Sequence, residues 1–168
     1  MRSSSALTLA TAAFIVLGAA PAGFPSGVRD DAVLQVRGAF FALSVADVDA
    51  SARWYEEKLG LGVVMRAPRT DETRSAATVL RGGGLTVELV RHDDARPLRG
   101  LVPEGRGALG VHGIFKVGVT VDDLDATLAA LRARGVQPAM GPWPRRGDAP
   151  ANAIIRDAEG NYIQLFGR

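Results

Sequence analysis

The stretch "LSVADVDAS", residues 43–51, and the stretch "VTVDDLDAT", residues 119–127, decide the fold that we expect, because the second repeats the first. Both begin apolar, polar, apolar and then carry an acid, an aliphatic residue, an acid, an alanine and a hydroxyl, 76 residues apart. The same offset places "VEL", residues 87–89, onto "IQL", residues 163–165. A constant offset across separate motifs indicates an internal repeat, so we expect two copies of one structural module.

Each copy predicts a strand, a helix and three further strands. In the first copy, residues 39–45 alternate as a strand, a helix begins at the capping Asp47 and runs to about Lys58, and strands follow near 61–66, 75–81 and 84–91. The second copy predicts a strand at 114–121, a helix over about 123–134, and strands near 136–140, 151–156 and 161–166. The sequence therefore predicts an α+β fold of two βαβββ modules, residues 38–92 and 113–168, joined by the linker 93–112.

Alternation along the strands separates the helix side of each predicted sheet from its far face, which we define as the face opposite the helix. Glu88 and Gln164 lie at equivalent positions of the two copies, and both are predicted on the far face. The far-face residues are Phe40, Ala42, Ser44, Thr86, Glu88, Val90, Lys116, Gly118, Thr120, Tyr162, Gln164 and Phe166.

Composition excludes several classes of function. The chain is 47% hydrophobic and 23% charged, as is usual for a globular domain, and its net charge of +2 comes from scattered arginines, so no nucleic-acid partner is expected. It has no cysteine, which excludes disulfides, thiol nucleophiles and thiolate zinc sites. No phosphate-binding loop, dinucleotide fingerprint or serine-nucleophile motif is present.

The N-terminus has the pattern of a secretory signal. Arg2 precedes the apolar run "ALTLATAAFIVLGAA", residues 6–20, and "APA", residues 20–22, provides the small residues of a cleavage site. We expect a signal peptide over 1–22, a tether over 23–37, and export to the periplasm or the medium, with no integral membrane span in the mature chain. An uncleaved interfacial anchor and a misassigned start are the alternatives.

Two segments, "FFALSVADVDASARWYEEKLGLGV" at 40–63 and "RDAEGNYIQLFG" at 156–167, resemble the vicinal oxygen chelate (VOC) superfamily, which includes glyoxalase I, bleomycin-resistance proteins and extradiol dioxygenases. The resemblance covers about residues 38–168. It implies that the modules form a cupped mixed sheet around a cavity, with the helices on the outside. In metal-dependent members, one ligand lies on the first and last strand of each copy, and by position these residues are Phe40, Glu88, Lys116 and Gln164.

Those four residue types are poorly suited to a metal. Phe40 has no lone pair, and Lys116 carries a positive charge that repels a divalent cation. Glu88 is then the single strong ligand, with neutral Gln164 as a weak oxygen donor. We therefore expect no metal. Our hypothesis is that Lys116 replaces the metal as the counter-charge of Glu88, and that Gln164 hydrogen-bonds to Lys116 or to Glu88. A solvated salt bridge on an open face is the alternative.

Further ligand candidates lie near this set. Tyr162 and Phe166 are predicted to face the cavity, where they could stack on a planar ligand or fill the core. The proline-rich segment "GPWPRRGDAPANAIIRD", 141–157, predicts a stiffened loop. The VOC resemblance implies that this loop borders the cavity mouth, where Trp143 and Arg146 could contact a ligand; a solvent-exposed connection is the alternative. His92, Asp93 and Asp94 form a cluster at the start of the linker, where a metal-binding role is not expected.

Three functions are compatible with these patterns. The first is metal-free binding of a small molecule in the cavity. The second is an enzyme of the same superfamily, a lyase, an isomerase or a dioxygenase, with a divalent metal or with Glu88 as general base. The third is a dimerisation or interaction module without a ligand, since such sheets also build homodimers.

Overall fold

The computed structural model describes residues 39–97, 101, 112–147 and 149–168. The predicted signal peptide, the predicted tether and most of the linker lie outside these residues. No helix in the described part of the chain is both long and apolar enough to cross a membrane.

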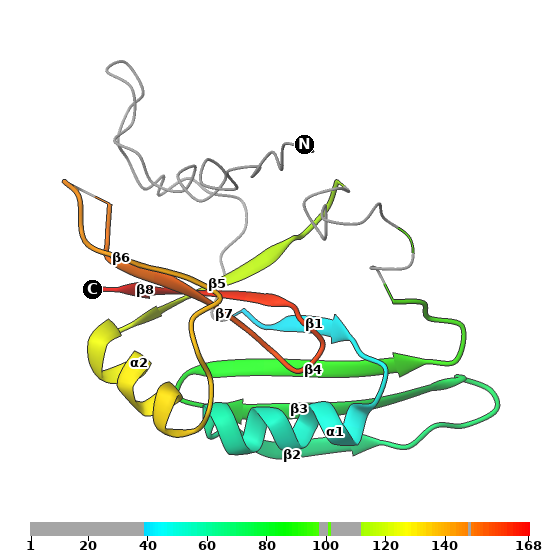
Figure 1. Ribbon diagram of the computed structural model, residues 1–168. Coiled ribbons are helices and arrows are strands. Elements are labelled where there is room, and N and C mark those ends of the chain that lie inside the picture. Colours follow the sequence, from blue (N-terminus) through cyan, green and yellow to red (C-terminus); the bar gives the residue numbers. More distant parts are fainter. Residues whose placement is uncertain (1–38, 98–100, 102–111, 148) are drawn as a thin grey trace, which may run out of the picture.

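The first module is a four-stranded sheet with one helical segment (Figure 1). Strand β1 pairs in parallel with β4, and the antiparallel strands β3 and β2 continue the sheet in the order β1-β4-β3-β2. Helix α1 continues directly into a π-helical turn, η2. The elements are β1 (Phe41–Ser44), α1 (Val48–Trp54), η2 (Tyr55–Leu59), β2 (Gly62–Ala67), β3 (Ser75–Gly82) and β4 (Leu85–His92).

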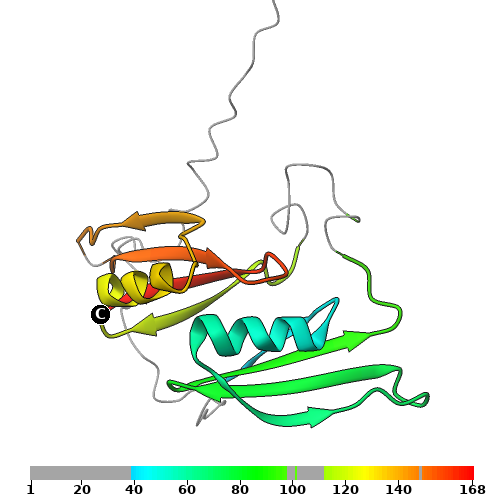
Figure 2. The same ribbon diagram turned by 60° about the horizontal axis from the view of Figure 1, so that its bottom comes forward.

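The second module repeats this arrangement. Its sheet has the order β5-β8-β7-β6, with β5 parallel to β8 and the other pairs antiparallel. The elements are β5 (Lys116–Val121), α2 (Leu124–Ala133), β6 (Met140–Trp143), β7 (Asn152–Arg156) and β8 (Tyr162–Gly167). The predicted α+β fold of two βαβββ modules is confirmed, and each helix lies in front of its own sheet in Figure 2.

The predicted position of one strand was wrong. The sequence predicted a strand near 136–140 and a proline-rich loop after it, whereas β6 spans Met140–Trp143 and includes Pro142. Strand β6 is the edge of its sheet and pairs only with β7, so a residue without an N–H is tolerated there. Trp143 therefore belongs to a strand, paired with Asn152, and not to a loop.

Both modules contribute their helix sides to one hydrophobic core. This side holds nearly all of the buried apolar residues, so burial drives the helices onto the sheets and the modules onto each other. The core comprises Val45, Val48, Ala52, Tyr55, Leu61, Leu80, Val87, Leu89, Leu124, Leu128, Leu131, Val136, Ala153, Ile155, Ile163 and Leu165. The predicted assignment of strand residues to the helix side agrees with this core.

Candidate functional site

The far faces of the two edge strands β1 and β5 are open. Ala42 and Ser44 on β1 are exposed, and so are Gly118 and Thr120 on β5. Phe40, which immediately precedes β1, is 63% exposed despite its large apolar ring. These residues are therefore accessible in the single chain.

Glu88 lies in the middle of the first far face. It pairs with Ala42 of β1 on one side and with Val79 of β3 on the other, and it is half-buried. Within the described residues, its carboxylate forms no hydrogen bond and no ion pair. The hypothesis that Lys116 serves as its counter-charge is therefore wrong for one chain.

Gln164, at the equivalent position of the second module, is enclosed. It is 1% exposed, and its Nε2 donates to Oδ1 of Asn152 over 2.9 Å. Asn152 in turn donates through Nδ2 to the carbonyl oxygen of Pro150 over 3.1 Å, which fixes both amides. The Gln164 Oε1 atom has no partner in the described part of the chain. Gln164 thus bonds to its own sheet and not to Glu88 or Lys116, contrary to the hypothesis.

Lys116 begins β5, and its ammonium nitrogen lies 5.1 Å from the ring centroid of Phe115. Partial burial lowers its pKa below the usual value of 10.5, because a lysine that loses water without gaining a carboxylate is held less firmly in its charged form. Across the sheet it pairs with Tyr162. Two of the predicted ligand residues, Lys116 and Tyr162, are therefore neighbours in the sheet.

A cleft of about 580 Å³ opens between the modules, where β1 and β4 end and β5 and β8 begin. Lys116 and Tyr162 line it, whereas Phe40, Glu88 and Gln164 do not. Phe166, Trp143 and Arg146 lie away from it as well. Other residues of the lining are Ser44, Ala46, Arg91, Arg96, Phe115, Arg156 and Glu159. The structure thus brings two of the eight predicted ligand residues into this cleft.

Phe166 and Trp143 form part of one cross-strand row on the second far face. Phe166 pairs with Thr120 and with Asn152, and Asn152 pairs with Trp143. A ring carbon of Phe166 lies only 3.2 Å from the place where a side chain at Gly118 would begin, so the ring covers that glycine. Arg146 forms a backbone bridge with Ala149 outside the named strands.

The turn between β7 and β8 joins the modules, a contact that sequence reasoning missed. The buried Tyr55 hydroxyl donates to Oδ2 of Asp157 over 2.9 Å, and the backbone N–H of Ala46 donates to Oε1 of Glu159 over 2.9 Å. Burial, reinforced by the Asp157 charge, raises the pKa of Tyr55 far above its usual value. The motifs "WY" and "RDAEGN" were visible in the sequence, but no local pattern shows that they meet.

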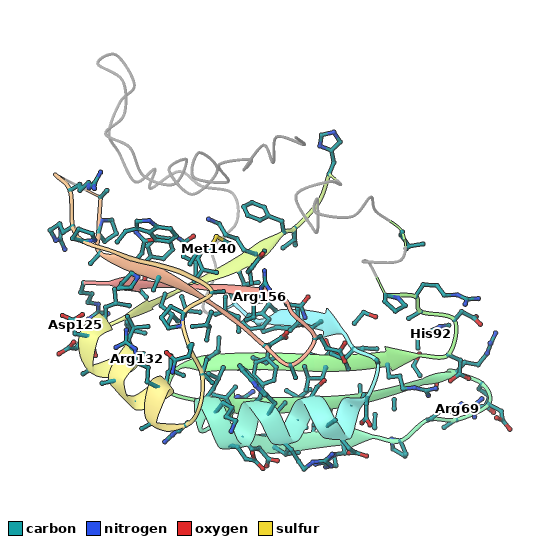
Figure 3. The ribbon with its side chains drawn as sticks, viewed as in Figure 1. Arg69, His92, Asp125, Arg132, Met140 and Arg156 are labelled. Carbon is teal, nitrogen blue, oxygen red and sulfur yellow. The ribbon has the colours of Figure 1, made fainter. Side chains whose placement is uncertain are left out.

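Near the linker, the cluster of His92, Asp93 and Asp94 is held by arginines. Asp93 contacts Arg69 at 2.9 Å and Arg91 at 3.1 Å, and the hydrogen bond from Arg69 is the main reason why the pKa of Asp93 lies below its usual value. Asp94 forms an ion pair with Arg74. Figure 3 labels Arg69 and His92 in this region of the protein. In the part of the chain that the structure describes, no three His, Asp or Glu side chains are placed to hold a metal ion.

The four positions that correspond to metal ligands do not suit a metal in this structure either. Glu88 is the one carboxylate among them, and Gln164 donates Nε2 to Asn152, which leaves only its buried Oε1 as an atom that could bind a metal. Lys116 lines a different part of the molecule, and Phe40 precedes the strand rather than facing Glu88 across the sheet. One carboxylate and one buried amide oxygen are too few donors for zinc or iron.

A sequence profile of the Glyoxalase/Bleomycin resistance protein/Dioxygenase superfamily matches residues 38–165. This chain belongs to that superfamily. The match includes both modules, so the VOC resemblance is confirmed over residues 38–165. Among curated proteins, none matches the chain.

Solved structures show the same fold. A glyoxalase family protein from Enterococcus faecalis is 18% identical, with a TM-score of 0.61 over 76% of this chain and 94% of that one. A glyoxylase/bleomycin resistance protein/dioxygenase domain from Frankia sp. EAN1pec is 22% identical, with a TM-score of 0.58 over 80% and 98%. An antibiotic binding protein from Streptomyces sp. CB03234 is 22% identical, with a TM-score of 0.55 over 79% and 96%. At these identities the likeness establishes the VOC fold and leaves the chemistry open.

Proposed function

We propose that this VOC protein binds a small organic molecule without a metal, in the cleft between its two modules. The observation that carries the proposal is the cleft of about 580 Å³ itself, which is of the size that ligand pockets usually have and combines apolar with polar lining residues. Two lining residues, Lys116 and Tyr162, were predicted as ligand contacts from the sequence. The similar fold of an antibiotic binding protein supports a binding role.

A pair of equivalent residues tests where ligands bind. Ser44 on β1 and Thr120 on β5 are both exposed and stand at matching positions of the repeat, but Ser44 lines the cleft and Thr120 does not. We expect organic compounds to raise the melting temperature of the wild-type protein, and Ser44→Trp, which fills the cleft, to abolish this shift. Thr120→Trp should retain it.

The same melting experiment includes zinc, nickel, manganese and iron(II). Stabilisation by one of these metals alone, with about one metal bound per chain by elemental analysis, would contradict the proposal and favour an enzyme. A ligand-induced shift that survives in Ser44→Trp would place the ligand elsewhere in the protein.

Export is part of the proposed function. The charged, apolar and small-residue segments of residues 1–22 support a cleaved signal peptide. The test is N-terminal sequencing of the protein recovered from the periplasm or the medium of a bacterial host. A mature chain that begins at Gly23 supports export, and an intact Met1 in the cytoplasmic fraction contradicts it.

A second copy of the chain is proposed to cover the far face beside Phe40. The support is the 63% exposure of this ring next to the exposed Ala42 and Ser44, together with the position of β1 at the sheet edge. In such a homodimer, the predicted contacts Glu88, Phe166, Trp143 and Arg146 could serve a ligand held between the copies, whereas Gln164, which is 1% exposed, would not reach it. Light scattering should give the mass of a dimer, and Phe40→Asp should reduce it to that of a monomer; a monomeric wild type contradicts the idea.

A further inference from the structure

The cleft between the modules carries more positive than negative charge. Its two carboxylates already have partners, because Asp93 pairs with Arg69 and Arg91, and Glu159 accepts a hydrogen bond from the backbone of Ala46. The cationic side chains of the lining are Arg91, Arg96, Lys116 and Arg156. Apart from Arg91, none of these cations forms an ion pair within the described residues. The lining residues that the structure describes therefore keep an excess of positive charge.

Strand register places two of these cations around one aromatic ring. Lys116 on β5 and Arg156 on β7 both pair with Tyr162 on the central strand β8. Residues opposite each other in neighbouring strands point to the same face, so the two cations flank Tyr162, with Cα atoms about 10 Å apart at the usual strand spacing. Tyr162 stands between the two cations, and because all three residues line the cleft, an anionic group bound there meets both positive charges.

Arg156 is held in place by a neutral group. Its Nη2 donates to the hydroxyl oxygen of Tyr162 over 2.7 Å, and its guanidinium carbon lies 4.9 Å from the ring centroid. These contacts orient the guanidinium. Among the described residues its charge has no counter-ion, and several of its N–H donors stay available. Figure 3 shows Arg156 where the second sheet approaches the first.

Lys116 is the more desolvated of the two cations. It is half-buried beside Phe115, and this partial burial lowers its pKa. A bound anion would return the electrostatic stabilisation that the ammonium group loses with its water. Phe115, with the 91% exposed Ile114 before it, adds apolar lining to the same end of the cleft.

We infer that the cleft selects organic anions: a carboxylate or sulfonate lies between Lys116 and Arg156, and the aromatic or apolar part of the ligand packs on Phe115 and Tyr162. This inference rests on the proposed binding function and names the class of ligand for it. Of the four far-face positions that correspond to metal ligands elsewhere in the superfamily, it uses Lys116 alone.

Two fluorescent dyes that differ in one charged group provide the probe. 1-Anilinonaphthalene-8-sulfonate is an anion, and N-phenyl-1-naphthylamine is the same aromatic skeleton without the sulfonate. We expect the anion to bind the full chain about 10-fold more tightly than the neutral dye, the usual contribution of a charge-assisted hydrogen bond. The difference should shrink as salt is added, because these cations are partly exposed.

Three charge-removing variants locate the effect. Lys116→Met and Arg156→Met should each weaken binding of the anionic dye about 10-fold and leave the neutral dye unchanged. Lys116→Arg should restore most of the affinity. The matched control is Arg132→Met, which removes the same charge from an exposed position on α2 outside the cleft (Figure 3) and should leave both dyes unaffected.

The outcomes separate the two proposals. Equal binding of both dyes, abolished by Ser44→Trp, overturns selectivity for anions and retains the binding function. Tight binding of the anion that neither Lys116→Met nor Arg156→Met weakens overturns the assignment of these residues. Binding of neither dye, with no stabilising organic compound found, overturns both proposals.

Discussion

The two modules share one backbone arrangement but differ in the roles of side chains at equivalent positions. Helices α1 and α2 begin in the same way, at Asp47 with φ −138° and ψ 110° and at Asp123 with φ −133° and ψ 109°. The strand orders correspond element by element. Differences appear on the far faces and in the last hairpin turn of each module. Duplication thus fixed the scaffold, whereas side chains at equivalent positions acquired separate roles.

Gln164 and Glu88 illustrate the difference. In the second module, Asn152 is placed to bind the amide of Gln164, and it pairs with Phe166. In the first module, Ala77 pairs with Val90, the repeat equivalent of Phe166, so no amide is available for Glu88. Gln164 is thus enclosed at 1% exposure, whereas Glu88 is only half-buried.

The hairpin turns differ even more. The turn between β3 and β4 contains Gly83 and Gly84, both with positive φ, and has no side chain to make contacts. In the equivalent turn of the second module, Asp157 Oδ2 accepts from Tyr55 and from the Asn161 side chain, and Oδ1 accepts from the backbone N–H groups of Glu159 and Asn161. This carboxylate ties the second module to the first.

The largest expected effect follows from this carboxylate. Asp157→Ala leaves the Tyr55 hydroxyl buried without an acceptor and loosens the turn, so the free energy of unfolding should fall by about 3 kcal/mol. Urea denaturation measures it, with Glu72→Ala, an exposed acid in the β2–β3 turn, as a control that should change little. A loss equal to that of the control would show that the turn does not hold the modules together.

The sequence predicted the repeated parts of this molecule and not the contacts between them. The offset that aligns Asp47 with Asp123 also placed the strands and the two faces, because local periodicity determines them. Tyr55 and Asp157 lie 102 residues apart, and their meeting depends on how the modules pack. Residue types made Lys116 and Tyr162 ligand candidates, but the register of β7 against β8, which residue types do not determine, is what places Arg156 beside them.

A swap of the two equivalent far-face residues sharpens the comparison. Gln164→Glu introduces a charge at a position that is 1% exposed and removes the donor to Asn152, so it should cost about 2 kcal/mol of stability at neutral pH. The reciprocal Glu88→Gln affects a half-buried group that has no partner among the described residues, and it should change stability by less than about 0.5 kcal/mol. Equal costs in urea denaturation would mean that the two faces are equally enclosed.

The smallest effect concerns what the modules have in common. Oδ1 of Asp47 accepts from the backbone N–H of Ala50 over 2.9 Å, and Oδ1 of Asp123 accepts from that of Ala126 over 2.9 Å. Asp47→Ala and Asp123→Ala should therefore lower the melting temperature by a similar amount, about 3 °C each. Calorimetry of both variants tests this equality.

Acidity adds a directional check on the first cap. The hydrogen bond from Ala50 holds the pKa of Asp47 below its usual value of 3.8, so the cap stabilises the fold above that pH and stops doing so as pH falls through the lowered pKa. The stability of the Asp47→Ala variant should then differ from that of the wild type at neutral pH and converge with it in strong acid.

Because one core includes both helices, either cap variant should melt in a single transition. Two transitions in the Asp47→Ala variant would show instead that the modules unfold separately, and that the contact between Tyr55 and Asp157 is too weak to couple them.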